Sequence, residues 1–240
     1  MTLKQSLGRA LIPTLPISRH VFEHLRGETN ALWVRAMHKA HPGYRLRARD
    51  LRERRDILLN LGCGPFGLPG WVNLDLFALK EVAMRTDCRR NLPIGDGACR
   101  GIHVEHYFEH LTHEEEVPRF LAECRRCLAD DGILRIIVPD AGGFARAYAE
   151  DGWDSLEKLA ADGTSMQKTF ATKMDALSHV MVQGYEHFGG YDYETLALAL
   201  AKAGYRSVTQ CSFRMGNFPG GCIDRDQHRP YSLYVEAMKS

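Results

Sequence analysis

Long apolar runs are absent from this sequence. No stretch approaches the roughly 20 apolar residues that cross a bilayer, and no apolar segment of signal-peptide length follows Lys4 and Arg9. We therefore expect a cytoplasmic protein without a membrane span. With 45% hydrophobic and 25% charged residues, the chain is also neither disordered nor fibrous by composition.

A paired cysteine pattern is missing too. The seven cysteines are odd in number and scattered along the chain, a pattern that does not indicate a disulfide framework. Cys124 and Cys127 form a C-x-x-C, but it lies in a helical pattern and no second pair accompanies it. We therefore expect reduced, mostly buried thiols rather than a zinc or redox site.

The net charge of +1 conceals an asymmetry along the chain. Residues 1–56 contain 12 Lys and Arg against 5 Asp and Glu, while the remainder contains 19 against 25. A basic segment of this kind suits a phosphorylated substrate, an anionic membrane surface, nucleic acid, or the acidic body of its own chain.

The length of 240 residues fits one domain with additions. Residues 1–56 show helical patterns interrupted at Pro13, Pro16 and Pro42, with Ser18 as an N-cap. Arginines alternate with leucine and alanine over 45–55, and this segment is expected to lead into the first strand. We interpret 1–56 as a helical extension of a domain that spans 57–240.

That domain begins with a buried strand, a glycine turn and a second strand. The apolar run 57–61 precedes Gly62 and Gly64, which permit positive φ and leave room for a ligand against the backbone. Residues 71–76 form the second strand candidate, with Asp75 near its carboxyl end. In a parallel sheet this edge binds small molecules, and an acidic residue there suits two ribose hydroxyls.

A crossover helix is missing between these two strands. Residues 65–70 are too few and too rich in proline and glycine to form one. Without its dipole a pyrophosphate has little to hold it. The pattern therefore favours a nucleoside ligand without a phosphate chain.

Alternating strand and helix patterns continue to the end of the chain. Strands are expected over 83–87, 102–105, 133–138, 208–213 and 233–238, and a helix capped by Asp192 over 194–203. Thr112 and Glu115 form a capping-box pattern before an amphipathic helix, and residues 130–132 read as a turn. Residues 141–190 exceed an ordinary connection; aromatic and Met residues at helical spacing there are typical of core, with a lid over the substrate as the alternative.

These motifs resemble class I S-adenosylmethionine-dependent methyltransferases. The resemblance rests on Asn-Leu-Gly-Cys-Gly at 60–64 and Asn-Leu-Asp-Leu at 73–76, then on Glu105-His106-x-x-Glu109-His110-Leu111, Asp131-Gly132 and Val138-Pro139-Asp140. It extends to a bacterial subgroup often associated with polysaccharide biosynthesis. It implies an α/β, Rossmann-like sheet, mostly parallel, whose last strand is antiparallel and closes the sheet edge, with a helical insertion after the fifth strand.

The resemblance also implies where the cofactor binds. Its contacts fall on the first turn, the second strand end, the segment after the third strand and the fourth strand end: Asn60, Leu61, Gly62, Cys63, Gly64, Asp75, Leu76, Asp87, Cys88 and Glu105. Asn60 departs from the Asp or Glu that many such enzymes carry there, so the charge attraction to the cofactor ammonium is lost. Asp87 could equally be a strand-end cap.

Three residues are candidates for acid–base chemistry. His106, just past the fourth strand, is the first choice as general base and His187 the second, since imidazole titrates near neutrality. Asp140 could orient either one, whereas Glu109 and His110 are interpreted as helix-start structure. The spacing of His103, His106, His110 and His113 invites a metal, but they do not share one face, and no metal is expected.

The expected function is methyl transfer from S-adenosyl-L-methionine to a small molecule, a hydroxyl of a sugar or glycan precursor such as a sugar nucleotide. The alternatives are O- or N-methylation of another metabolite and a non-catalytic cofactor-binding partner subunit. No nucleic-acid partner is expected, and a homodimer formed through the N-terminal extension stays open.

Overall fold

The computed structural model describes residues 18–239. The expectations for Lys4, Arg9, Pro13 and Pro16 lie outside these residues. Within them no helix is long and apolar enough to cross a membrane.

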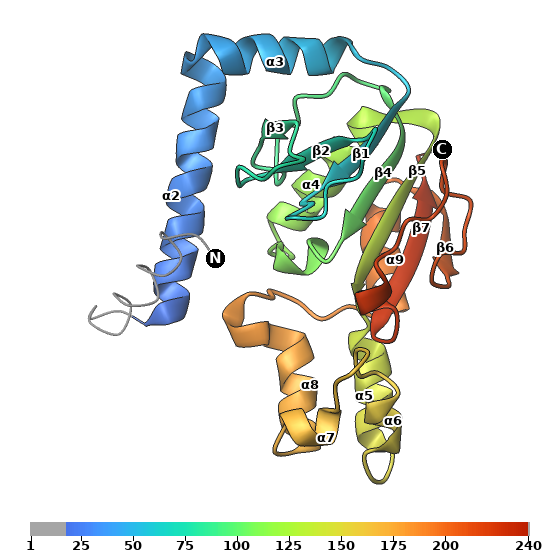
Figure 1. The fold of residues 1–240 in the computed structure, drawn as a ribbon. Coiled ribbons are helices and arrows are strands. Elements are labelled where there is room, and N and C mark those ends of the chain that lie inside the picture. Colours follow the sequence, from blue (N-terminus) through green and yellow to red (C-terminus); the bar gives the residue numbers. More distant parts are fainter. Residues whose placement is uncertain (1–17, 240) are drawn as a thin grey trace.

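A seven-stranded sheet forms the centre of the molecule (Figure 1). Its order is β3-β2-β1-β4-β5-β7-β6; β7 runs antiparallel to both of its neighbours, β5 and β6, and the other pairs are parallel. The predicted Rossmann-like, mostly parallel sheet with an antiparallel last strand is thus confirmed. The last strand does not close the edge, however, because β6 lies outside it. The strands are β1 Ile57–Leu61, β2 Val72–Asp75, β3 Met84–Arg85, β4 Cys99–Glu105, β5 Leu128–Pro139, β6 Arg206–Cys211 and β7 Ser232–Met238.

One face of the sheet is apolar and packs against helices. Leu59, Leu134 and Val235 contribute to a core that also receives α4 (Glu116–Cys127) and α9 (Tyr193–Lys202), which lie together behind the sheet in Figure 1. Asp192 caps α9 as predicted. The predicted capping box of α4 is wrong: the helix begins at Glu116, whose carboxylate accepts the Thr112 N–H.

The opposite face carries a buried polar row. Asn73, Asn60, His103, Arg135 and Glu236 are register partners across β2, β1, β4, β5 and β7, and each is at most 5% exposed. The loop between β6 and β7 covers this row, with Phe218 stacked on Trp71. A loop rather than a helix therefore closes this side of the sheet, and the polar row supplies its hydrogen bonds.

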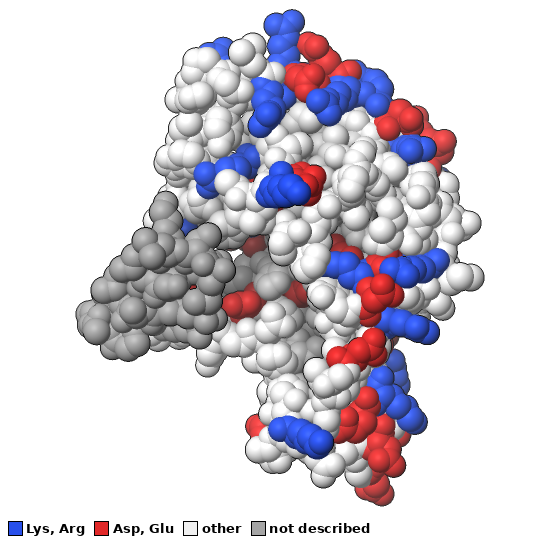
Figure 2. All heavy atoms as spheres, in the orientation of Figure 1, with Lys and Arg blue, Asp and Glu red and all other residues white. Residues whose placement is uncertain are grey.

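The N-terminal helices lie along the β3 edge of the sheet (Figure 1). α2 (Arg19–Ala40) ends just before Pro42, and α3 (Pro42–Glu53) begins at that proline, which fits the first helical turn; the interruption expected at Pro42 is thus confirmed. Residues 45–53 are accordingly helical, and residues 54–56 lead into β1. Basic and acidic side chains intermix over α3 (Figure 2), as in the Arg49–Glu53 and Arg54–Asp50 pairs.

The insertion forms a small lobe beyond the carboxyl edge of the sheet (Figure 1). It contains α5 Ala141–Ala149, α6 Asp154–Glu157, α7 Met166–Thr169, α8 Lys173–Val182 and the 3-10 turn η3 Gln183–Tyr185. Phe144, Leu156 and Val180 centre its own apolar cluster. Met174 and Met181 are exposed, so for these two the core interpretation is wrong.

The prediction of a turn at 130–132 is also wrong, because the strand β5 includes these residues.

Candidate functional site

A hydrogen bond joins the glycine turn after β1 to the carboxylate at the end of β2. Asp75 Oδ2 accepts the Gly64 N–H at 2.9 Å, and Oδ1 accepts the Phe77 N–H at 2.8 Å. Gly62 and Gly64 both have positive φ, +61° and +52°. A Cβ on Gly64 would meet no atom within 4 Å, so the turn leaves open space in front of its backbone.

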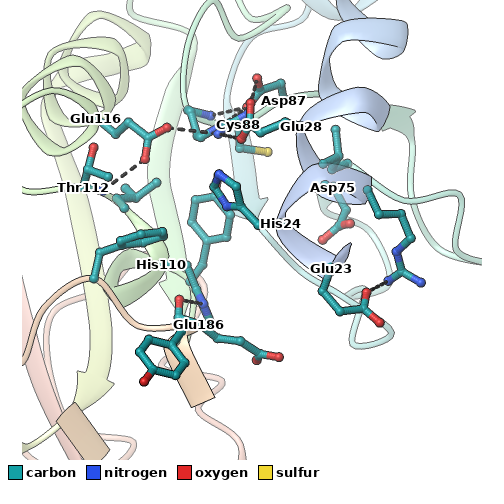
Figure 3. A pocket seen from close by; sticks show the side chains of 18 of the residues that line it. Glu23, His24, Glu28, Asp75, Asp87, Cys88, His110, Thr112, Glu116 and Glu186 are labelled. Carbon is teal, nitrogen blue, oxygen red and sulfur yellow. Dashed lines mark hydrogen bonds and ion pairs between the residues drawn. The ribbon is translucent and has the colours of Figure 1, made fainter. Parts of the chain in front are cut away.

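A cavity of about 1490 Å³ opens at this edge of the sheet. Gly64, Asp75, Leu76, Asp87 and Cys88 line one side of it. The first turns of α2 face them, and the 107–116 and 183–188 segments complete the wall. Figure 3 shows Glu23, His24 and Glu28 from α2 facing Asp75 and Asp87, with His110 and Glu186 on the far side. Acidic residues outnumber arginines in this lining, which favours a cationic ligand over a phosphate.

Asp87 ties α2 to the sheet edge. Its carboxylate accepts hydrogen bonds from Arg35 of α2 and from Arg89, and Arg89 also pairs with Glu28 and Glu116. Burial alone would raise the pKa of Asp87, but the two arginines outweigh it and hold that pKa below its usual range. The basic extension thus meets acidic groups of its own chain, and α2 becomes a fixed wall of the cavity.

Other predicted cofactor residues lie elsewhere. Asn60, Cys63 and Glu105 line a second cavity of about 660 Å³ on the polar face, Leu61 is fully buried, and Gly62 packs under the Tyr107 ring. Asn60 Nδ2 donates to Asn73 Oδ1 at 3.0 Å. Asn73 in turn bonds both backbone groups of Leu68, so these amides support the loop that replaces a crossover helix.

Glu105 is enclosed by cationic and imidazole groups. Its carboxylate contacts His103 Nε2 at 3.2 Å, His228 Nδ1 at 2.9 Å and Arg225 Nε at 2.9 Å. Burial alone would raise the pKa of Glu105, but the hydrogen bonds from the histidines and the charge of Arg225 hold that pKa well below its usual range. The carboxylate therefore anchors the 225–228 segment to the end of β4.

Acid should weaken the fold through Glu105. Because the pKa of this carboxyl is depressed in the folded state, its stabilising contribution is complete above the unfolded value of about 4.3 and is lost as the pH falls below it. We expect Glu105→Gln to flatten the pH dependence of the unfolding free energy between about pH 5 and pH 3. Urea titrations at several pH values measure this slope. The exposed Glu53→Gln is the control, and equal slopes in both variants would contradict the assignment.

His106 is not among the residues that line the 1490 Å³ cavity. It has φ +52°, its Nε2 lies 2.8 Å from Ser232 Oγ, and its ring packs on His228 with centroids 3.7 Å apart. Burial and the neighbouring His228 lower the pKa of His106 to about 2, so the ring is neutral and weakly basic. Asp140 caps α5 by accepting the Gly143 N–H; among the described residues neither His106 nor His187 is a hydrogen-bond partner of its carboxylate.

His187 lies close to Glu109 and His110, which the sequence analysis interpreted as helix-start structure. Its ring lies 5.1 Å from that of His110, which lines the cavity, and one ligand atom each from Glu109, His110 and His187 lie within 4.8 Å of one another. Burial raises the pKa of Glu109 to about 8 and lowers the pKa of both histidines. The Glu-His dipeptide at 109–110 was the available signal, but its partner is 77 positions away.

Tyr107 and the cavity face of α2 were also missed. The Tyr107 ring covers Gly62 and lines the cavity, and Glu23, His24 and Glu28 come from a helix interpreted only as an extension. A helical period of acidic and histidine residues at 20, 23, 24 and 28 could have indicated a functional face.

No protein-family model matches the chain, and no curated protein matches it. Solved structures do resemble it. A S-adenosylmethionine-dependent methyltransferase from Thermotoga maritima, described as a possible histamine N-methyltransferase, is 15% identical with a TM-score of 0.47, covering 92% of this chain and 99% of that one. One from Aquifex aeolicus is 16% identical with a TM-score of 0.45, covering 89% and 98%.

A third similar structure is the 1,6-didemethyltoxoflavin-N1-methyltransferase of Burkholderia thailandensis with S-adenosylhomocysteine bound. It is 14% identical with a TM-score of 0.45, covering 94% of this chain and 92% of that one. The chain spans about half the length of two others, the methyltransferase domains of the citrinin polyketide synthase and of CurJ. At these identities and scores, what this chain binds has to be inferred from its own geometry.

Proposed function

We propose that this protein is a S-adenosylmethionine-dependent methyltransferase acting on a small-molecule acceptor. The observation that supports the proposal is a shared cavity at the carboxyl ends of β1, β2 and β3. The predicted cofactor residues that line it are Gly64, Asp75, Leu76, Asp87 and Cys88. This is the edge at which open parallel sheets bind ligands.

The residues present fit that cofactor. The open backbone at Gly64 leaves room for a close approach, and the Asp75 carboxylate retains lone pairs for two ribose hydroxyls after accepting two backbone N–H groups. The acidic lining suits a sulfonium and an ammonium. With the cofactor bound, S-adenosylmethionine would supply an activated methyl group.

The chain's own residues then have to hold and shield the reactants. α2 and the 183–188 segment enclose the cavity from two sides, which restricts water and fixes orientation. The 110–116 and 183–188 segments form the side of the cavity that the proposed cofactor contacts leave unoccupied, and an acceptor can fit against them. We place the acceptor there, and the lobe of 141–190 acts as the lid that carries the 183–188 part of this wall.

For the acceptor we propose a hydroxyl of a neutral sugar or glycan precursor. The acidic wall formed by Glu114, Glu115 and Glu186 repels the phosphates of a sugar nucleotide. A radiolabelled methyl-transfer assay on neutral glycans, sugar nucleotides and small amines separates these acceptor classes. Transfer to amines alone would contradict the hydroxyl assignment, and cofactor binding without transfer to any acceptor would favour a non-catalytic partner subunit.

Asp75→Asn tests the cofactor site. The amide keeps one acceptor oxygen but turns an N–H₂ group toward a backbone N–H, and the charge-assisted bonds to a ribose diol are lost. We expect the affinity for S-adenosylhomocysteine, measured by calorimetry, to fall about 10- to 100-fold. Asp162→Asn, exposed in the α6–α7 loop, is the matched control. Wild-type affinity in Asp75→Asn would remove this carboxylate from the site.

A further inference from the structure

We propose that Glu109, His110 and His187 form a binding site for a first-row transition-metal dication. One potential ligand atom from each residue lies within 4.8 Å of one from each of the others. Glu109 and His110 come from the 3-10 turn η2 (Phe108–His110), and His187 comes from the end of the insertion. The Phe188 N–H donates to the Glu109 carbonyl at 2.9 Å, which fixes the two segments side by side.

Both histidines have a backbone hydrogen bond at one ring nitrogen, as metal-binding imidazoles do. His110 Nδ1 lies 2.8 Å from the Glu186 carbonyl oxygen, and His187 Nδ1 lies 2.9 Å from the Val180 carbonyl oxygen. An acceptor at Nδ1 requires that nitrogen to carry the proton, so Nε2 of each ring keeps its lone pair. A backbone carbonyl on the remote nitrogen is the usual support of a metal-binding imidazole.

The carboxylate lacks the partners that burial demands. Glu109 is 1% exposed, and neither of its oxygens has a hydrogen-bond partner among the described residues. Among the described residues, the hydroxyl of the buried Tyr191 also has no hydrogen-bond partner. A buried carboxyl group without hydrogen-bond partners is costly, and a cation between it and the two imidazoles would bind both the carboxylate and the ring nitrogens.

His106 adds a further acceptor beside the same carboxylate. When its Nε2–H donates to Ser232 Oγ, its Nδ1 presents a lone pair 3.4 Å from Glu109 Oε1. An ionised Glu109 carboxylate would face this lone pair as a second acceptor and be repelled by it, whereas a cation beside the carboxylate removes that repulsion. His106 is not one of the three residues whose ligand atoms lie within 4.8 Å of one another, so it adjoins the site through Glu109.

The donor set selects the kind of ion. Imidazole nitrogens with one carboxylate suit Zn²⁺, Co²⁺, Fe²⁺ or Mn²⁺, whereas Mg²⁺ and Ca²⁺ prefer oxygen ligands. Ligand atoms about 2.0–2.2 Å from such an ion require only a modest contraction of the cluster. His187 thus becomes a ligand rather than a general base in this arrangement.

The location suggests a use for the ion. His110 lines the large cavity on the wall assigned to the acceptor. Resting on the proposed methyl transfer, the ion would orient an acceptor through its hydroxyl oxygens, which favours a vicinal diol over an amine.

Co²⁺ binding to the full chain, stripped with a chelator and without S-adenosylmethionine, tests the site. We expect one Co²⁺ per chain by calorimetry, with visible ligand-field bands, and paramagnetically shifted NMR signals from imidazole Nδ1–H groups. Glu109→Gln and His187→Ala should each weaken binding by about 100-fold or more. His179→Ala, an exposed histidine on α8, should change it less than twofold.

The NMR signals keep the test valid should a variant fail to fold, because they are read on the wild-type chain. No stoichiometric Co²⁺, absent imidazole signals, preference for Mg²⁺, or unchanged affinity in both folded variants would overturn the site. Calorimetry with S-adenosylhomocysteine on the same samples separates this outcome from failure of the proposed function, since each ligand is measured without the other.

Discussion

Replacing Arg135 by methionine is expected to lower the free energy of unfolding by about 3–5 kcal/mol. Arg135 is 0% exposed and lies on β5 opposite Glu236 of β7. Its guanidinium makes two hydrogen bonds with Asp224, at 2.8 and 2.6 Å, and one with Glu236 at 2.7 Å. Methionine fills a similar volume but leaves two buried carboxylates without a counter-charge.

The same side chain holds the loop that covers the polar face. Arg135 also donates to the carbonyls of Ser212 and Met215, and Asp224 accepts the Arg214 N–H. Urea unfolding measures the loss, and hydrogen exchange should show residues 212–225 opening first. Arg49→Met removes an exposed pair with Glu53 and should change stability by no more than about 0.5 kcal/mol. Equal effects in the two variants would contradict a buried, charge-dependent clamp.

Gly62→Ala is expected to destabilise the protein by about 2–5 kcal/mol, from two separable costs. The first is the positive φ of +61°, which costs an L-residue about 1–2 kcal/mol. The second is steric, since a Cβ at this position would overlap Cδ2 and Cγ of the Tyr107 ring. Overpacking of this kind costs about 1–3 kcal/mol.

Gly64→Ala is the matched control for this prediction. It has the same sign of φ, +52°, but its Cβ would meet nothing within 4 Å, so only the conformational cost applies. In a double-mutant cycle with Tyr107→Ala, Gly62→Ala should show a coupling of about 1–3 kcal/mol. Identical losses in Gly62→Ala and Gly64→Ala, measured by urea unfolding, would show that Tyr107 does not confine the turn.

Much of the fold could be predicted because it depends on short-range patterns. The apolar run of β1, the glycines after it and the Asp192 cap of α9 act within a few residues, and each lies where expected. The errors arose where neighbours outweigh local preference. The Asp-Asp-Gly at 130–132 has turn chemistry, yet Leu128 and Ile133 on either side of it pair with β4, and the side chain of Lys239 binds the Leu128 carbonyl and the Asp130 carboxylate.

The candidate site was predicted in part for a related reason. Asp75, Leu76, Asp87 and Cys88 follow strand ends, and strand ends of a parallel sheet meet at one edge. Asn60 and Glu105 were assigned to the same ligand, but side chains alternate along a strand. Glu105 therefore shares the polar face with His103, two residues earlier, and takes part in its ion pairs instead.

The sequence by itself determined the local features of the fold. These are the apolar runs that form strands, the glycine turn, the acidic residue at the end of the second strand and the missing crossover helix. These are local, since backbone conformation and period act between near neighbours. Tertiary structure alone decided the polar row through Arg135, the placement of α2 over the cavity, and the meeting of Glu109 and His110 with His187. Each joins residues far apart in the chain, and only sheet register and the path of the insertion bring them within contact.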